Sequence, residues 1–378
     1  MLNRRSLRIK VMQSLFAFQQ SKEANYLLCC DSIEQAFSPD LNSMEPQDKK
    51  ELNKQKKEAL KLLDKVFETA ASVEHEDEKI KKVVEESLVH YRKSVADDVR
   101  FFKKGLKQDV EKIYRYYLSV LTLAIAIAEA AKADKKINHI NFVNNRWVQA
   151  LQESNDLKKE ALRLNATWDN KFDRVQLWLR DVVKQDNEYM AYLDKKSPAV
   201  DDQKRILNHV FRRVILGKTI INDYFEEEVL HWSEDREIVK GMVEKTVKSY
   251  DPASAEPLQL HQLSLNWEDD LHFIENLFTG SINLAPEYSK LIADNTRNWE
   301  VDRLPLIDRV ILEMAITEML SFPSIPVKVT MNEYIELAKN YSTPKSRQFI
   351  NGILDVITKH LKTAGKIKKS GRGLMDNK

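Results

Sequence analysis

The sequence has little glycine, few cysteines and almost no net charge, and each scarcity limits what the protein can be. Only 8 of the 378 residues are glycine, while 31% are Asp, Glu, Lys or Arg. Because chains poor in glycine and rich in Lys, Glu, Leu and Ala favour helix over sheet, the composition predicts an all-α protein. The formal net charge is only +2 at pH 7. Attraction of the whole molecule to nucleic acid is therefore weak, and any such binding must come from a local basic patch.

The chain also lacks disulfide and membrane signals. Its two cysteines, Cys29 and Cys30, are adjacent in the sequence, which suits neither a disulfide framework nor a C-x-x-C metal pair. The most apolar run, Tyr116 to Ala128, is shorter than the roughly 20 residues that a spanning helix needs. The first residues are amphipathic rather than uniformly apolar, unlike a signal peptide. We therefore expect a cytoplasmic protein with no membrane segment.

Catalytic and metal-binding patterns are missing as well. The eight histidines are scattered, with no H-E-x-x-H and no pair at zinc-finger spacing, and the sequence has no G-x-G-x-x-G or G-x-x-x-x-G-K-[ST] loop. Carboxylates cluster at residues 226–228 and 268–270, but charged helix faces carry such clusters routinely. The sequence thus predicts a protein that is not an enzyme and holds neither a cofactor nor a metal.

The first residues form a basic, amphipathic stretch that predicts a helix over residues 3–20. The apolar residues at helical spacing are Leu7, Val11, Leu15 and Phe18. Arg5 and Arg8 lie on a neighbouring arc, where we expect a partner to reach them. Guanidinium groups bind phosphate through paired hydrogen bonds, and an aromatic such as Phe16 offers a base a stacking surface. The pattern suits single-stranded RNA, and a solvated basic turn on an ordinary docking helix is the alternative.

Three further helices with tight connections are expected near the C-terminus. The first begins at Pro305, and its apolar side consists of Ile307, Val310, Ile311, Met314 and Ala315. The second begins at a capping box of Thr330 and Glu333, and the third at Thr343 and Pro344. Three short helices joined in this way form a compact bundle.

Three motifs in these two regions point to a known family. The N-terminal R-R-x-x-R-x-x-x-x-Q-x-L-[YF] pattern consists of Arg4, Arg5, Arg8, Gln13, Leu15 and Phe16. The pattern I-P-x-x-V-x-x-N-E-x-[IV]-E-L-A-K occupies residues 325–339, and F-[IV]-N-G-[IV]-L-D occupies residues 349–355. Together they resemble the NusB family of bacterial transcription antitermination factors. The resemblance covers residues 1–25 and 268–362 and implies a NusB-like helical bundle.

The resemblance also implies a domain organisation. Residues 1–25 supply the first helix of the NusB-like domain, and residues 268–362 supply its C-terminal helical bundle. Residues 26–267 have no counterpart in compact relatives, and we interpret them as a helical insertion or as an elaborated N-terminal subdomain. Residues 363–378 are expected to form a basic flexible tail.

Within the insertion we expect a surface loop over residues 30–57, rich in polar residues. Helices are expected over residues 58–96, 110–133, 141–155, 173–193 and 203–228. A weak internal echo, F-to-W-x-x-D-R, occurs from Phe211 to Arg236 and from Phe278 to Arg303. It indicates either a duplicated helix pair or a chance similarity.

The resemblance implies an RNA-binding face. Arg4, Arg5 and Arg8 correspond to the basic motif that holds the boxA RNA element, and Phe349 and Asn351 correspond to positions near that RNA. Ser6 stands where some relatives carry a third consecutive arginine, a departure that bears on the strength of RNA binding.

The resemblance implies a second face, for a protein partner. Asp308 corresponds to an acidic position that docks NusE, a small ribosomal subunit protein, and Phe16 to an aromatic close to the same region. Lys345 stands where an acidic residue precedes the Phe349 motif in relatives, so it changes the charge of the partner-facing loop. We expect Asp308 to be exposed, on the polar side of its helix.

These features together predict an RNA-binding transcription antitermination factor. It would bind boxA-like single-stranded RNA together with NusE and act in the RNA polymerase antitermination complex on ribosomal RNA operons. One alternative is a helical protein-interaction scaffold without RNA binding. The other is an rRNA-modification enzyme, because rRNA methyltransferases can carry a NusB-like domain. Such an enzyme would need a Gly-rich α/β domain after the NusB part, and the sequence ends at Lys378.

Overall fold

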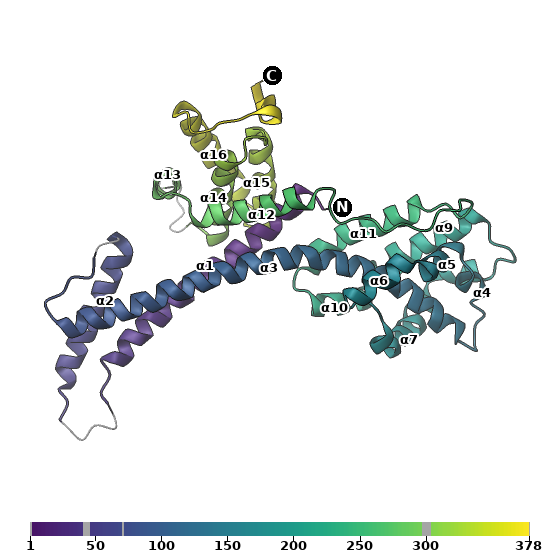
Figure 1. The fold of residues 1–378 in the computed structure, drawn as a ribbon, viewed down its shortest axis with the longest axis horizontal. Coiled ribbons are helices and arrows are strands. Elements are labelled where there is room, and N and C mark those ends of the chain that lie inside the picture. The colour runs from purple at the N-terminus through teal and green to yellow at the C-terminus, as the bar shows by residue number, and fades with distance from the viewer. Residues whose placement is uncertain (1, 41–45, 70–71, 297–303, 378) are drawn as a thin grey trace. The chain divides into compact units, whose positions relative to one another are not determined.

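The chain is helical throughout the part that its structure describes. The computed structural model describes residues 2–40, 46–69, 72–296 and 304–377, and these residues form helices and no strand (Figure 1), which confirms the all-α prediction. They divide into two compact units: unit 1 is Met1–Leu7 with Lys107–Leu271, and unit 2 is Arg8–Leu106 with His272–Lys378. The helices α1 (Arg4–Ala36) and α3 (Glu78–Lys132) contribute residues to both units.

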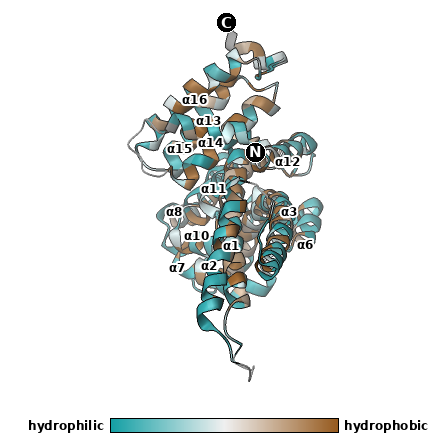
Figure 2. Cartoon of the chain, turned by 90° about the vertical axis from the view of Figure 1, so that its left-hand side faces the viewer, coloured by the Kyte–Doolittle hydropathy of each residue, from teal (hydrophilic) through white to brown (hydrophobic). Residues whose placement is uncertain are grey.

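Part of unit 2 is a three-helix arm. The later part of α1, α2 (Lys49–Thr69) and the early part of α3 run alongside one another (Figure 1). Their shared core consists of Cys29, Ile33, Phe37, Ala59, Leu62, Leu63, Val66, Ile80, Val84, Leu88 and Tyr91. Most of α2 is hydrophilic (Figure 2), so only its narrow apolar stripe is buried. Burial of these stripes drives the association of the three helices.

The rest of unit 2 is a helical bundle. Its elements are α12 (Trp267–Ile282), of which residues from 272 on belong to unit 2, α13 (Pro286–Thr296), α14 (Leu306–Ser321), α15 (Val327–Tyr341), α16 (Ser346–Thr363) and the 3-10 helix η4 (Gly371–Asn377). Helix α14 packs against α15 and α16. Phe18 of α1 lies edge-on to Phe278 of α12, with ring centroids 6.2 Å apart. The expected packing of the first helix against the C-terminal helices is therefore confirmed.

Unit 1 is built on the second half of α3. Its other elements are α4 (Ile140–Val143), α5 (Arg146–Glu153), α6 (Asn155–Arg163), η1 (Asp169–Lys171), α7 (Phe172–Asp181), η2 (Val183–Gln185), α8 (Asn187–Leu193), α9 (Val200–His209), η3 (Val210–Ile215), α10 (Thr219–Glu228) and α11 (Trp232–Ser249). The buried hydroxyl of Tyr117 lies 2.6 Å from that of Thr246. Trp147 and Trp168 are also buried, and their indole N–H groups donate to backbone carbonyls at 3.0 and 2.9 Å. The polar groups of these large side chains therefore have hydrogen-bond partners inside unit 1.

Part of helix α3 is apolar because it lies in the protein core. It is long enough to cross a membrane, and one 18-residue window is apolar enough to do so. Of that window, 72% is buried inside the structure. Packing within the protein therefore accounts for the composition of this window.

Several expected boundaries in the insertion are wrong. The loop predicted over residues 30–57 is largely helical, because α1 continues to Ala36 and α2 already begins at Lys49. The predicted bounds 58–96 and 110–133 are also wrong, although most of these residues are helical: α2 extends to Thr69, and α3 is one continuous helix of 55 residues from Glu78. Its middle carries i,i+3 and i,i+4 ion pairs such as Lys107 with Glu111 on the exposed side, while Leu106, Val110 and Ile113 are buried on the other.

The later insertion segments are helical but interrupted. Residues 141–155 contain α4 and α5, separated where the side chain of Asn145 accepts from the backbone of Trp147 and Val148. Residues 173–193 contain α7, η2 and α8, and residues 203–228 contain α9, η3 and α10. Of the internal echo, residues 299–303 lie outside the described residues, so the duplication stays a prediction.

Gly217 follows the π-helix η3 at a point where a side chain has no room. A Cβ there would lie 2.5 Å from the backbone oxygen of Arg213. We expect Gly217→Ala to lower the free energy of unfolding by about 2 kcal/mol, because backbone must shift to relieve the clash. Urea denaturation followed by circular dichroism measures this. Gly241→Ala in α11 is the control: nothing lies within 4 Å of its Cβ, so a gain of about 0.5 kcal/mol is expected instead.

Candidate functional site

Arg8 is buried and does not present its charge to a partner. Its side chain is 3% exposed, and its guanidinium donates two hydrogen bonds to the Glu318 carboxylate, from Nε to Oε2 at 2.7 Å and from Nη2 to Oε1 at 2.8 Å. The expectation that a partner can reach Arg8 is therefore wrong. The reason is tertiary: a fully buried carboxylate on α14 needs a cation, and Arg8 supplies it.

The Arg8 and Glu318 pair joins three helices of unit 2. Thr330 and Tyr334 of α15 both donate to the same carboxylate, at 2.8 and 3.1 Å. Burial opposes the Arg8 charge, but the hydrogen bonds and charge of Glu318 outweigh it and raise the pKa of Arg8 above its ordinary value. Burial, together with the charge of Glu318, also raises the pKa of Tyr334 well above its usual range. The network thus holds α1 to α14 and α15 with all four polar groups paired.

The capping box predicted for the second C-terminal helix is wrong. Helix α15 begins at Val327, directly after Pro326, so Thr330 lies within the helix rather than before it. Its hydroxyl bonds Glu318 instead of a backbone N–H. Glu333 is half-buried, and its Oε2 lies 3.6 Å from Arg8 Nη1. Both residues therefore belong to the buried network around Arg8.

The other two N-terminal arginines differ from Arg8. Arg4 is half-buried in unit 1 and forms ion pairs with Asp269 and, at 3.9 Å, with Asp270 of α12. Arg5 is exposed. Of the three arginines of the motif, Arg5 is therefore the one whose guanidinium a ligand reaches most readily.

The two predicted RNA-binding residues of α16 also separate by burial. Phe349 is 7% exposed and belongs to the hydrophobic core of unit 2, so it offers little surface for stacking on a base. Asn351 is exposed on the same helix. Arg347 and Gln348 beside it are exposed as well. The polar side of α16 therefore presents hydrogen-bond donors to solvent.

Asp308 is buried, contrary to expectation. It is 2% exposed, and its Oδ2 accepts a hydrogen bond of 2.7 Å from the hydroxyl of Ser346, the first residue of α16. The Ser346 hydroxyl in turn contacts those of Ser342 and Thr343 at 2.9 and 2.8 Å. The Asp308 carboxylate therefore anchors the turn between α15 and α16. Its position on α14 predicted exposure, but its hydrogen bond to Ser346 pairs the carboxylate inside the protein.

The remaining predicted partner residues are accessible. Phe16 of α1 is 37% exposed, although the stripe beside it is buried. Lys345, next to Ser346, is exposed at the turn that Asp308 anchors. Both residues lie in unit 2 and are available to a protein partner.

Glu318 and Tyr334 are the main site residues that sequence reasoning missed. Glu318 lies among apolar residues of α14, with Ile316, Thr317 and Met319 all buried around it. An acidic residue inside such a run is a signal for a buried cation partner. That signal names no partner, because Arg8 is 310 residues away in the sequence.

Comparison with known proteins places these helices in a family. A model of the NusB family matches residues 237–359, which run from α11 to α16. No solved structure matches the chain. Residues before 237 are outside the family match.

Individual relatives match over the same part of the chain. The transcription antitermination protein NusB of Salinibacter ruber is 44% identical over 103 residues, which are 27% of this chain and 64% of that relative. The protein of the same name from Chloroherpeton thalassium is 43% identical over 104 residues, 28% of this chain and 49% of that relative. The chain thus spans less than two thirds of the length of these two relatives. The NusB of Bacillus licheniformis is 37% identical over 111 residues, 29% of this chain and 86% of that relative. On this coverage, the chain belongs to the NusB family.

Proposed function

We propose that this protein is a transcription antitermination factor that binds boxA-like single-stranded RNA together with NusE. In this proposal it acts within the RNA polymerase antitermination complex on ribosomal RNA operons. The observation that carries the proposal is the identity of 37% to 44% with three relatives named transcription antitermination proteins. The family match, residues 237–359, includes Asp308, Lys345 and Asn351.

The proposed RNA contacts are the accessible members of the predicted set. Arg5 and Asn351 are exposed and supply a charged and a neutral donor for phosphate or base edges. Arg4 adds charge from a half-buried position next to Asp269. Arg8 and Phe349 act indirectly, since their burial fixes the helices that carry the exposed donors.

The proposed NusE contacts are Phe16 and Lys345. Phe16 presents an accessible aromatic ring, a residue type common at the centre of protein interfaces. Asp308 is buried and contributes indirectly: its hydrogen bond to Ser346 positions the turn that carries Lys345. Two modest sites, one for RNA and one for protein, then combine into tighter joint binding.

Arg5→Ala tests the RNA contact without disturbing the core. We expect boxA-like RNA to bind about threefold to tenfold more weakly at low salt, because one exposed cation is lost. The loss should shrink at higher salt, since phosphate contacts release counterions. Fluorescence anisotropy with labelled RNA, with and without NusE, measures both effects.

Lys22→Ala is the matched control for Arg5. Lys22 is exposed on the same helix but outside the basic motif, so its removal should leave RNA affinity nearly unchanged. If wild-type protein binds no boxA-like RNA even with NusE present, the scaffold alternative replaces the proposal. If both variants weaken binding equally, the effect is one of overall charge and Arg5 is not a specific contact.

A further inference from the structure

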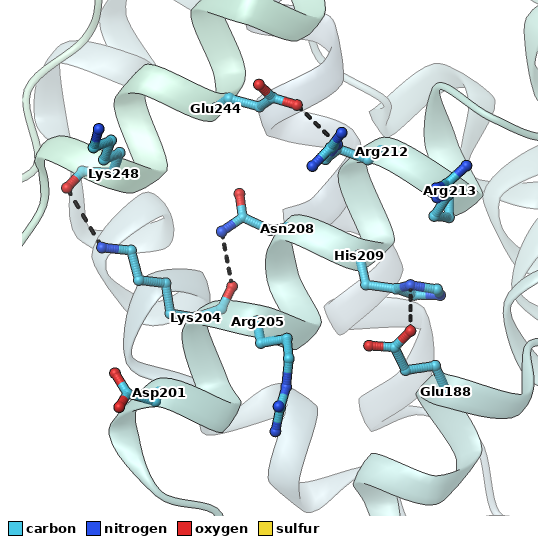
Figure 3. Close-up of a pocket in the computed structure, with 10 residues that line it drawn as sticks. All are labelled: Glu188, Asp201, Lys204, Arg205, Asn208, His209, Arg212, Arg213, Glu244 and Lys248. Atoms are coloured by element: carbon cyan, nitrogen blue, oxygen red, sulfur yellow. Dashed lines mark hydrogen bonds and ion pairs between the residues drawn. The ribbon is translucent and has the colours of Figure 1, made fainter.

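Unit 1 contains a groove lined entirely by polar and charged side chains. It has a volume of about 560 Å³ and lies between α9, η3, the start of α8 and α11. Figure 3 draws its ten lining residues, which include five lysines and arginines and three carboxylates. The whole chain carries a net charge of only +2, so this groove concentrates positive charge locally. It lies outside every residue of the proposed RNA and partner faces.

Three of the cations in the groove have no carboxylate partner. The side chains of Arg213 and Lys248 form no ion pair or hydrogen bond with the described residues, and both are exposed residues of the groove lining (Figure 3). Lys204 donates only to the backbone oxygen of Lys248 at 3.5 Å, and its ammonium lies 5.8 Å from the ring centroid of Trp147. These charges remain available to an anion.

The other cations in the groove are held in place by single carboxylates. Arg212 Nε lies 2.9 Å from Glu244 Oε1, and Arg205 pairs with Asp202. Both arginines are more than half exposed, at 52% and 66% of their side chains. Surface pairs of this kind are weak and exchange readily for another anion. The groove therefore has two ordered cations in addition to the three unpaired ones.

The π-helix η3 places two of these arginines in the groove. Leu216 N donates to Phe211 O at 2.9 Å across this wide turn. Val210, Phe211, Val214 and Ile215 are buried, which leaves Arg212 and Arg213 on the solvent side. Wide turns of this kind are rare and frequently occur at functional sites.

The lining distinguishes between two kinds of anionic partner. Protein interfaces require apolar or aromatic anchors at their centre, and no lining residue of this groove is aliphatic or a Phe, Tyr or Trp. Phosphate backbones, by contrast, are bound by Arg, Lys and amide donors alone. Asn208 supplies such an amide at the middle of the groove, although it also bonds the Lys204 backbone oxygen at 3.1 Å.

We propose that this groove of unit 1 is a second RNA-binding site, which contacts the phosphate backbone without reading sequence. Trp147, whose ring centroid lies 5.8 Å from the Lys204 ammonium, is buried and offers no face to a base. Recognition there depends on charge and therefore on salt. The proposal goes beyond the proposed function, because it concerns different residues and an RNA without a boxA element.

The test uses the full chain and a short oligouridylate RNA that has no boxA-like sequence. Arg213→Glu with Lys248→Glu reverses the two unpaired charges without breaking an ion pair of the described residues. We expect at least about fivefold weaker binding at about 50 mM salt and a shallower dependence of log affinity on log salt, by roughly 1.4 for two single-strand phosphate contacts. Fluorescence anisotropy over a salt series measures both.

Lys159→Glu with Lys196→Glu is the matched control. Both lysines are exposed in unit 1 outside the groove, so the same charge change there should leave affinity within about twofold. Equal weakening in both pairs, or an unchanged salt slope in the groove pair, would overturn the proposal. Equally tight binding of polyglutamate would overturn the assignment to RNA. A groove pair that loses oligouridylate binding while Arg5→Ala retains it separates this site from the boxA-binding face.

Discussion

Replacing Glu318 with Ala should lower the free energy of unfolding by about 3 to 5 kcal/mol. The substitution removes one carboxylate but leaves three groups without their acceptor: the Arg8 guanidinium and the hydroxyls of Thr330 and Tyr334. Each is buried, and Tyr334 and Thr330 are 0% exposed. Among the described residues, Arg8 keeps only Glu333, at 3.6 Å, as an ion-pair partner, and a buried cation that loses its hydrogen-bonded carboxylate costs more than the pair itself contributes. Urea denaturation followed by circular dichroism provides the measurement.

Two further variants identify the cause of that loss. Glu336→Ala removes a carboxylate of α15 that is 35% exposed and pairs with Lys339 at 3.5 Å, so we expect a loss below about 0.5 kcal/mol. Arg8→Met combined with Glu318→Leu removes both buried charges. This double variant should lose clearly less than the sum of the two single changes. Additive losses would show that the two residues do not stabilise the fold as a pair.

Asp308→Lys should destabilise the protein by at least about 3 kcal/mol. The carboxylate is 2% exposed and accepts from Ser346, so a lysine there brings an unpaired ammonium into a buried site and removes the acceptor of α16. Thermal unfolding of the purified variant measures the effect. Asp355→Lys is the control, because that aspartate is 53% exposed on α16 and should change stability by less than about 0.5 kcal/mol. A stable, fully folded Asp308→Lys protein would contradict the burial of this residue.

This result also decides how the NusE proposal can be tested. A charge reversal at Asp308 that abolishes NusE binding would be uninformative, because the turn before α16 would be lost as well. Asp308→Asn keeps a hydrogen-bond acceptor for Ser346 and removes only the charge. It should retain the fold at a cost of about 1 kcal/mol, and NusE binding can then be compared directly with Phe16→Ala.

The sequence did not indicate which of the predicted site residues are accessible and which are buried. Arg5, Asn351, Phe16 and Lys345 are exposed, as a ligand-binding role requires. The family motifs also contain Arg8 and Phe349, which are buried. A motif gives only the residue types that recur at a given spacing. It does not distinguish a residue that contacts a ligand from one that stabilises the fold around the site.

The sequence by itself determined the helical class, the family motifs and the apolar stripes of the terminal helices, because residue composition and spacing act locally along the chain. Only the tertiary structure decided that Arg8 is buried against Glu318, that Asp308 anchors the start of α16 and that α3 is a single helix of 55 residues. Burial depends on partners that come from distant positions, 310 residues apart for Arg8 and 38 for Asp308. Helical spacing shows on which side of its own helix a charged residue lies, but it cannot identify such a distant partner. The free energy of burying a charge depends on that partner.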